Sequence, residues 1–279
     1  MEKNELLKGA YDLHVHTAPD VVKRKFDDYE FCERLIATGM GGEIIKNHYF
    51  DTSTRAYLLR RKHPQLNIGG GIVLNNSVGG LNPEAVTKAA KLDAKIIWMP
   101  TMDSYSYEKI KNIPNKNLEK YIYILNEKGN LKDEIYDILE IAKENKIFIA
   151  TGHISSYEGL KLIKEANRYG VRTIVTHADN PNDLYTIEEQ KKAVNLGALI
   201  EHAYFTVFHS RTNIEEIARQ IKEVGYENVF LTTDFGQMNS PYPDEGLLEF
   251  SLKLIEQNFT EAEIRKMIVE NPELILNYR

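Results

Sequence analysis

Short apolar runs and amphipathic segments alternate along the whole chain. The runs are rich in Ile, Val and Leu with little period-two alternation, which is typical of strands buried on both faces. They lie at residues 11–16, 43–46, 68–74, 95–99, 147–150, 173–176, 198–200 and 229–231. Segments with apolar residues at helical spacing separate them, at 27–38, 52–62, 83–92, 132–145, 157–169, 185–196, 213–224 and 245–257. This order predicts parallel strands joined by right-handed crossovers.

The spacing of the strands predicts a single (β/α)8 (TIM) barrel over residues 1–279. Most steps between successive strand ends have the size of one strand–helix unit, and eight such units suit a chain of 279 residues. The same repeats also suit a doubly wound open sheet, because alternation alone does not determine closure. The step after the fourth strand is twice as long. It contains an inserted loop at 105–131, where 121–131 is typical of a small hairpin with Gly129 in its turn.

A further helix is predicted near the end of the chain, at 260–269. Thr260 stands at its expected N-cap and Glu263 three residues later, which is the pattern of a capping box.

Composition and charge exclude several classes of protein. Lys and Arg number 35 against 41 Asp and Glu, and the resulting charge of −6 argues against a general nucleic-acid-binding protein. The single cysteine excludes a disulfide framework and a cysteine-based zinc site. Neither a signal peptide nor a stretch of roughly 18 apolar residues is present, so we expect a cytoplasmic protein with no membrane partner. The 16 tyrosines are compatible with a homo-oligomer interface.

Histidines gather at the ends of the predicted strands, where the loops of a (β/α)8 barrel carry its chemistry. Six of the eight do so: His14, His16, His48, His153, His177 and His202. His14 and His16 lie two residues apart on one strand, so both imidazoles share a face and can bind one metal ion. Taken singly, His153 and His177 are typical of hydrogen-bonded core histidines, and Asp234 at the end of the eighth strand is typical of a cap.

Taken together, these positions resemble the amidohydrolase superfamily of metal-dependent barrels. The resemblance rests on a His-x-His on the first strand, histidines on the fifth and sixth and an aspartate on the eighth: His14, His16, His153, His177 and Asp234. It implies that these five hold one or two divalent metal ions and that Asp234 also takes a proton from the attacking water. The ending Asn-Pro-x-x-x-Leu, at 271–276, is similar to the superfamily's tail, and 233–247 looks like an uncharacterised branch without an assigned substrate.

The second strand departs from the superfamily pattern. Binuclear members often bridge their metals with a lysine or glutamate from the fourth strand, and residues 95–101 offer neither at their carboxyl end. Lys46 and His48 instead share one face of the second strand. Burial lowers the pKa of a lysine, and a neutral amine can take up carbon dioxide to become a bridging carboxylate. Lys46 is equally suited to stabilising substrate charge.

Asp-x-His-x-His followed by His48 also resembles the polymerase and histidinol phosphatase (PHP) phosphoesterases, in which the second-strand histidine is a metal ligand. The usual third-strand glutamate and late Asp-x-His of that family are missing here. On the seventh strand, Glu201 and His202 must point to opposite faces. We expect His202 to face the mouth and to stabilise charge or orient a ligand. The basic run at 23–25 is typical of a solvated surface, although it also suits an anionic substrate.

We therefore expect a metal-dependent hydrolase that acts on an amide, ester, lactone or phosphoester bond of a small molecule. One or two divalent ions would lower the pKa of water and polarise the bond, with Asp234 as general base and Lys46 or His202 stabilising charge. Zinc suits a histidine-rich site, and Mn, Fe or Ni suit it as well. The alternatives are a PHP-like phosphoesterase, a lyase or decarboxylase on a mononuclear barrel, and a non-catalytic binding barrel.

Overall fold

Nine short strands, each parallel to its neighbours, run through the described part of the computed structural model, which comprises residues 3–114, 116–180 and 185–278. They are β1 Tyr11–Val15, β2 Gly42–Ile45, β3 Asn67–Gly69, β4 Gly71–Val73, β5 Ile96–Trp98, β6 Phe148–Ala150, β7 Thr173–Val175, β8 Leu199–Ala203 and β9 Val229–Thr232. β1, β2 and β3 pair in that order, and β4 to β9 pair in chain order. Only Gly70 separates β3 from β4, so these two are halves of one barrel strand.

Backbone hydrogen bonds close the barrel between its first and last strands. The N–H of Asp234 donates to the carbonyl of His14 at 3.0 Å, and the N–H of His16 donates to the carbonyl of Phe235 at 2.8 Å. These bonds join the end of β1 to the segment after β9. The predicted (β/α)8 barrel is thereby confirmed, and the open sheet is excluded.

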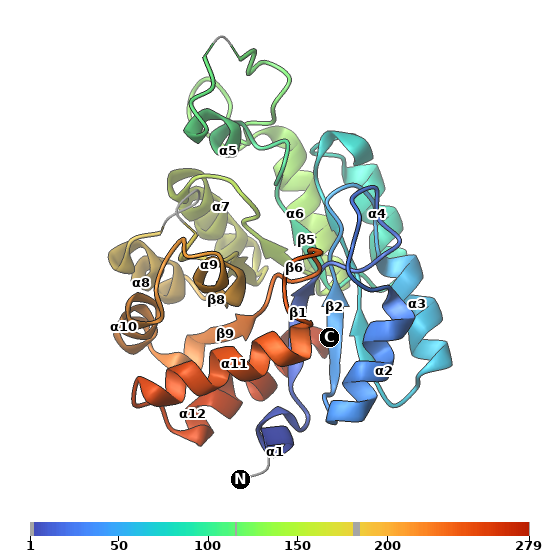
Figure 1. Cartoon of the computed structure of the whole chain (residues 1–279). Helices are drawn as coiled ribbons and strands as arrows, with labels where there is room; N and C mark the ends of the chain where they lie inside the picture. Colours follow the sequence, from blue (N-terminus) through green and yellow to red (C-terminus); the bar gives the residue numbers. More distant parts are fainter. Residues whose placement is uncertain (1–2, 115, 181–184, 279) are drawn as a thin grey trace.

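Helices surround the strands (Figure 1). They are α1 Lys3–Leu7, α2 Asp28–Thr38, α3 Ser53–Lys62, α4 Pro83–Lys91, α5 Tyr105–Ile110, α6 Asp133–Asn145, α7 Ser156–Tyr169, α8 Ile187–Asn195, α9 Tyr204–Phe208, α10 Ile214–Val224, α11 Pro243–Glu256, α12 Glu261–Arg265 and α13 Asn271–Leu276. Among the described residues, no helix combines the length and apolarity needed to cross a membrane.

Successive strand residues face two different apolar cores. On β2, Ile44 packs inside the barrel with Leu13 and Trp98, whereas Ile45 packs outside it in the core shared with the helices. Both faces of each strand are therefore buried, which is why the apolar runs show no alternation in the sequence.

The insertion after the fourth barrel strand has less regular structure than predicted. It begins with α5 and projects from the body of the molecule (Figure 1). The expected hairpin is reduced to one antiparallel bridge between Leu125 and Leu131, closed by a turn at 126–130. The capping box at the predicted last helix is confirmed, since Thr260 and Glu263 exchange their hydrogen bonds at the start of α12.

A buried carboxyl group on β2 makes stability depend on pH. Glu43 is fully buried, and neither of its oxygens has a hydrogen-bond partner within the described ranges. Burial, together with the nearby carboxylates of Asp28 and Asp12, raises the pKa of Glu43 well above its ordinary value. The folded protein therefore keeps a proton that the unfolded chain releases above about pH 4.

Folding stability should consequently fall with rising pH, by up to about 1.4 kcal/mol per pH unit between the unfolded and folded pKa values of Glu43. Glu43→Gln removes this titration, so the variant should gain stability relative to wild type between pH 5 and pH 8. Urea unfolding at both pH values measures the gain, with the exposed Glu127→Gln as matched control. If the difference in free energy of unfolding between Glu43→Gln and wild type does not change with pH, Glu43 is not protonated in the folded protein.

Candidate metal centre

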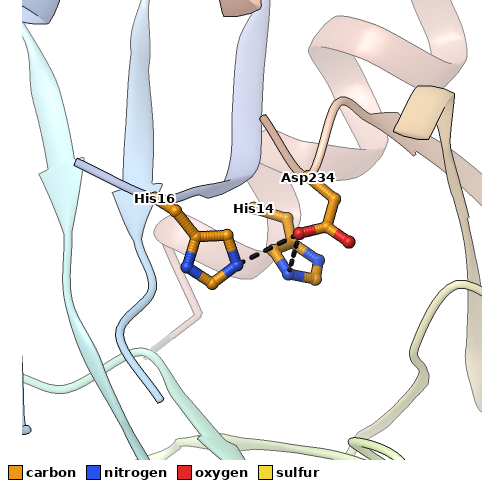
Figure 2. A group of neighbouring side chains, drawn as sticks. All are labelled: His14, His16 and Asp234. Carbon is orange, nitrogen blue, oxygen red and sulfur yellow. Dashed lines mark ion pairs between the residues drawn. The ribbon is translucent and has the colours of Figure 1, made fainter. Parts of the chain in front are cut away.

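His14 and His16 project from the carboxyl end of β1 towards Asp234 in the barrel mouth (Figure 2). Both histidines are buried. The register of β1 shifts between Asp12 and Val15, and Asp12 stabilises the shifted backbone. Its carboxylate accepts hydrogen bonds from the N–H of His14 at 3.2 Å and from the N–H and hydroxyl of Thr233 at 3.2 and 2.5 Å. Asp12, to which the sequence alone assigned no role, thus positions His14 and the neighbour of Asp234.

The Nε2 atoms of both imidazoles converge on one carboxylate oxygen. They lie 3.1 Å (His14) and 3.0 Å (His16) from Oδ1 of Asp234. On the other side of the ring, Nδ1 of His14 lies 2.5 Å from Oε1 of Glu201. A carboxylate only accepts hydrogen bonds, so Nδ1 of His14 carries a proton and Nε2 faces the mouth. A carboxylate behind a histidine orients metal-binding histidines in this way.

Burial and the carboxylates of Asp234 and Glu201 set the protonation states of the cluster. Burial lowers the pKa of His16 to about 3 and the pKa values of His48 and His153 well below the ordinary value. Burial also acts to lower the pKa of His14, but nearby carboxylates, Asp234 foremost, outweigh it and raise that pKa to about 9. Burial acts to raise the pKa of Asp234, but the two imidazoles hold it well below its usual range. At neutral pH the carboxylate of Asp234 and the neutral imidazoles of His16, His48 and His153 therefore face the mouth, whereas His14 is protonated and would release a proton on binding a metal ion.

Asp234 and the turn that follows it pass very close to the first strand. Asp234 adopts a left-handed backbone conformation with φ 56°, which aspartate and asparagine tolerate better than most residues. Gly236 has φ 143°, and a Cβ atom there would lie 1.8 Å from the carbonyl oxygen of His16. The contact that closes the barrel beside the site therefore requires glycine.

Gly236→Ala should lower the free energy of unfolding by about 3 kcal/mol or more, because backbone atoms rather than a flexible side chain occupy the space. Gly170→Ala is the matched control: Gly170 also has a positive φ, 75°, but nothing lies within 4 Å of its Cβ position. There the loss should be about 1 kcal/mol. Chemical unfolding of both variants measures the difference, and equal losses would contradict the close approach at His16.

Lys46 reaches the same cluster from the end of β2. It is fully buried, and its Nζ lies 2.9 Å from Nε2 of His14 and 5.3 Å from the centroid of the Trp98 ring. The amine therefore touches the imidazole nitrogen that faces Asp234. Both roles predicted for Lys46, metal bridge and charge stabilisation, are compatible with this position.

Three further histidines complete a ring around the mouth. The ring centroids of His16 and His48 are 4.8 Å apart, those of His48 and His153 5.9 Å, those of His153 and His177 5.0 Å, and those of His177 and His14 5.9 Å. Nδ1 of His153 is buried without a hydrogen-bond partner among the residues described. The five histidines predicted as ligands thus surround one space, and their individual roles stay predictions.

A threonine stands at the end of the fourth barrel strand, where binuclear relatives often place a bridging group. Thr101 Oγ1 lies 2.8 Å from Nδ1 of His48 and accepts a hydrogen bond from the amide of Asn75 at 2.7 Å. Thr101 and Asn75 therefore orient His48.

His202 does not face the mouth, so this expectation is corrected. Leu199 and Glu201 point into the barrel, whereas Ile200 and His202 point outward between the strand and the helices. Nδ1 of His202 lies 2.9 Å from Oδ1 of Asp179. Glu201 occupies the position expected for His202, because the side-chain alternation of β8 places odd-numbered residues inside. His202 therefore has no contact with the cluster through which it could stabilise reacting charge.

A cavity of about 140 Å³ opens above the imidazoles. Arg24, from the basic run at 23–25, shares its walls with the histidines, as do three residues to which the sequence alone assigned no role: Tyr107, Phe205 and Arg211. Tyr107 comes from α5, and its ring centroid lies 4.8 Å from that of His153, so the insertion contributes to the site. Larger depressions elsewhere on the surface, of about 560 and 530 Å³, lack a histidine cluster.

The barrel fold is similar to that of several solved structures, which include amidohydrolases. An amidohydrolase from Pseudomonas aeruginosa superposes with a TM-score of 0.67 at 14% identity, over 100% of this chain and 99% of that one. A probable dipeptidase, PvdM, from the same organism gives 0.67 at 9% identity, over 99% and 96%. The 2,6-dihydroxybenzoate decarboxylase from Rhizobium gives 0.62 at 10% identity, over 96% and 98%. The predicted resemblance is thereby confirmed at the level of the fold.

The chain itself belongs to a family of unknown function, DUF6282, whose model matches residues 9–201. A search of curated proteins finds no match.

Proposed function

We propose that this protein is a metal-dependent hydrolase that acts on an amide, ester, lactone or phosphoester bond of a small molecule. The observation that carries the proposal is the convergence of His14 and His16 on the carboxylate of Asp234 in a buried barrel mouth. The three donor atoms lie within 4.8 Å of one another, which suits one divalent cation. Zinc fits a histidine-rich donor set, and Mn, Fe or Ni fit it as well. When bound, the cation would acidify a water molecule and polarise the bond under attack.

Asp234 is the proposed general base. Its carboxylate is 16% exposed, whereas the imidazoles of His14 and His16 are 1% and 2% exposed, so Asp234 reaches both the ligand cluster and the cavity. The two imidazoles keep it ionised, so an oxygen of Asp234 can take up the proton of the attacking water and later pass it to the leaving group.

A second ion would require ligands from the remaining imidazoles of the ring and from Lys46. In that case Lys46, carboxylated at Nζ, would bridge the ions. With a single ion, the ammonium of Lys46 would stabilise negative charge that develops on the substrate.

A decarboxylase or lyase is the second candidate. Thr101 stands where a bridging carboxylate would be needed, which favours a single ion. One protein of the same fold is a 2,6-dihydroxybenzoate decarboxylase.

The test is metal analysis by mass spectrometry on protein purified without chelator, followed by a screen of amides, esters, lactones, aryl phosphates and aromatic acids. We expect at least one divalent ion per chain, and hydrolysis that chelation abolishes and added metal restores. Two ions per chain would support the Lys46 bridge. Release of carbon dioxide without hydrolysis would favour the decarboxylase. No metal, even after incubation with zinc or manganese, would contradict both candidates.

A further inference from the structure

One arginine of the predicted surface run is buried in the cavity above the metal ligands. The side chain of Arg24 is only 6% exposed, and its Nε donates to Oδ2 of Asp20 at 2.7 Å. The Asp20 side chain is itself fully buried. Nη2 of Arg24 lies 3.5 Å from Nδ1 of His16. The guanidinium therefore lies directly beside a predicted metal ligand.

The backbone beside Arg24 is anchored to the far end of the chain. The N–H of Lys25 donates to the carbonyl of Gly236 at 3.0 Å, and its Nζ donates to the carbonyl of Ser240 at 2.6 Å. The guanidinium is therefore positioned by a salt bridge and by a backbone contact to the turn after Asp234, which is a preorganised arrangement rather than a solvated one.

A second arginine lines the same cavity from the loop after α9. The N–H of Arg211 donates to the carbonyl of Thr206 at 2.8 Å, and its guanidinium carbon lies 4.9 Å from the centroid of the Phe205 ring. Across residues 3–114, 116–180 and 185–278, no carboxylate oxygen forms an ion pair with the guanidinium of Arg211. Unlike Arg24, it therefore carries a charge that no described acidic side chain balances.

We propose that Arg24 and Arg211 bind a carboxylate group of the substrate, so that the substrate class is a small carboxylic acid with a cleavable bond. This inference rests on the proposed function only in its statement that the bound acid contains a cleavable bond; binding of the carboxylate does not depend on it. A guanidinium offers five N–H donors in a planar fork that matches a carboxylate, and the contacts described for Arg24 use two of them. Phe205 and Tyr107 supply an apolar wall of the cavity, against which the rest of the substrate can pack.

Charge balance favours a monoanion over a phosphate dianion. Asp20 already balances Arg24, whereas no acidic side chain in the described part of the chain pairs with Arg211, so within that part the two arginines contribute one uncompensated positive charge. Asp234 adds a negative charge to the same cavity, which would repel a dianion more strongly than a carboxylate.

The test is the binding of benzoate, of its neutral isostere benzamide, and of inorganic phosphate to the full chain by calorimetry. It is made on chelator-treated protein and on zinc-loaded protein, so that anion binding is measured independently of hydrolysis. Benzoate should bind the metal-free protein at least about tenfold more tightly than benzamide, because charge-assisted hydrogen bonds are the stronger ones. Phosphate should bind more weakly than benzoate.

Arg211→Met, at an exposed position, should weaken benzoate binding at least about tenfold and leave benzamide binding unchanged. Arg24→Met should do the same, and Asp20→Asn combined with Arg24→Met avoids leaving a buried unpaired carboxylate. Arg61→Met is the matched control, because Arg61 is exposed and lies over the Tyr57 ring outside the cavity.

Equal binding of benzoate and benzamide, or benzoate binding that both arginine variants retain, would overturn the proposal. Benzoate binding that appears only with zinc and survives both substitutions would assign the carboxylate to the metal, and tighter binding of phosphate would assign the subsite to a phosphoester. Loss of benzoate binding in Arg211→Met, together with a wild-type protein that takes up no metal even when zinc or manganese is added, would support the anion subsite while contradicting the metal-dependent hydrolase.

Discussion

Asp234→Asn is expected to lower kcat on the first confirmed substrate by about 10³-fold, which is the range in which a positioned general base contributes. An amide at this position cannot take a proton from water. The substitution is otherwise conservative, because asparagine has nearly the same shape and tolerates the left-handed backbone conformation at φ 56°. The variant should therefore fold and keep most of its metal.

The measurement is kcat together with metal content on the same preparation, so that a lost base is distinguished from a lost ligand. Asp93→Asn is the matched control, since Asp93 also has a positive φ, 64°, and pairs with Lys95 away from the cavity. It should keep the wild-type kcat. Turnover by Asp234→Asn at the wild-type rate, with metal bound, would remove Asp234 from the role of base.

Replacing His14 and His16 together with asparagine is expected to reduce bound metal from at least one ion per chain to nearly none. Loss of an outer partner of a ligand already costs about 10- to 100-fold in metal affinity, and loss of two direct ligands should cost more. The double variant also removes the imidazole that pairs with both Asp234 and Glu201. Two neighbouring carboxylates without a partner destabilise the folded state.

His16→Asn alone is therefore the second variant, because it leaves the pair between His14 and Glu201 intact. It should retain the circular dichroism spectrum of the wild type, and its affinity for zinc should nevertheless be at least about 100-fold lower. His63→Asn, at the end of α3 and outside the cavity, controls for the loss of a histidine. An unchanged zinc affinity in the folded His16→Asn protein would mean that the ions bind elsewhere.

Much of the barrel could be predicted because its pattern is local. Strands buried on both faces require consecutive apolar residues, as at Ile44 and Ile45, and helices on a barrel surface require one apolar stripe. The capping box of Thr260 and Glu263 is also a short-range feature. The prediction of a hairpin at 121–131 was wrong in its extent. The turn is a local feature, but pairing of the two strands of a hairpin depends on contacts with the rest of the protein.

The sequence was less informative about the direction in which individual side chains of the candidate site point. The period of two separates Glu201 from His202 but does not say which of them faces the interior. That depends on how β8 pairs with β7 and β9, and the register places Glu201 against His14. Arg24 belongs to a basic run that looks solvated, and its burial depends on Asp20 and on the turn at Gly236.

By itself, the sequence determined the repeating strand–helix architecture, the gathering of histidines at strand ends and the separation of His14 from His16 by one residue. These features follow from the periodicity of buried positions and from the alternation of side chains along a strand. Only the tertiary structure decided that the barrel closes at Asp234, that Glu201 lies behind His14, and that Arg24 and Arg211 share one cavity. Each of these joins residues far apart along the chain, and such contacts depend on strand register and loop path, which local patterns do not encode.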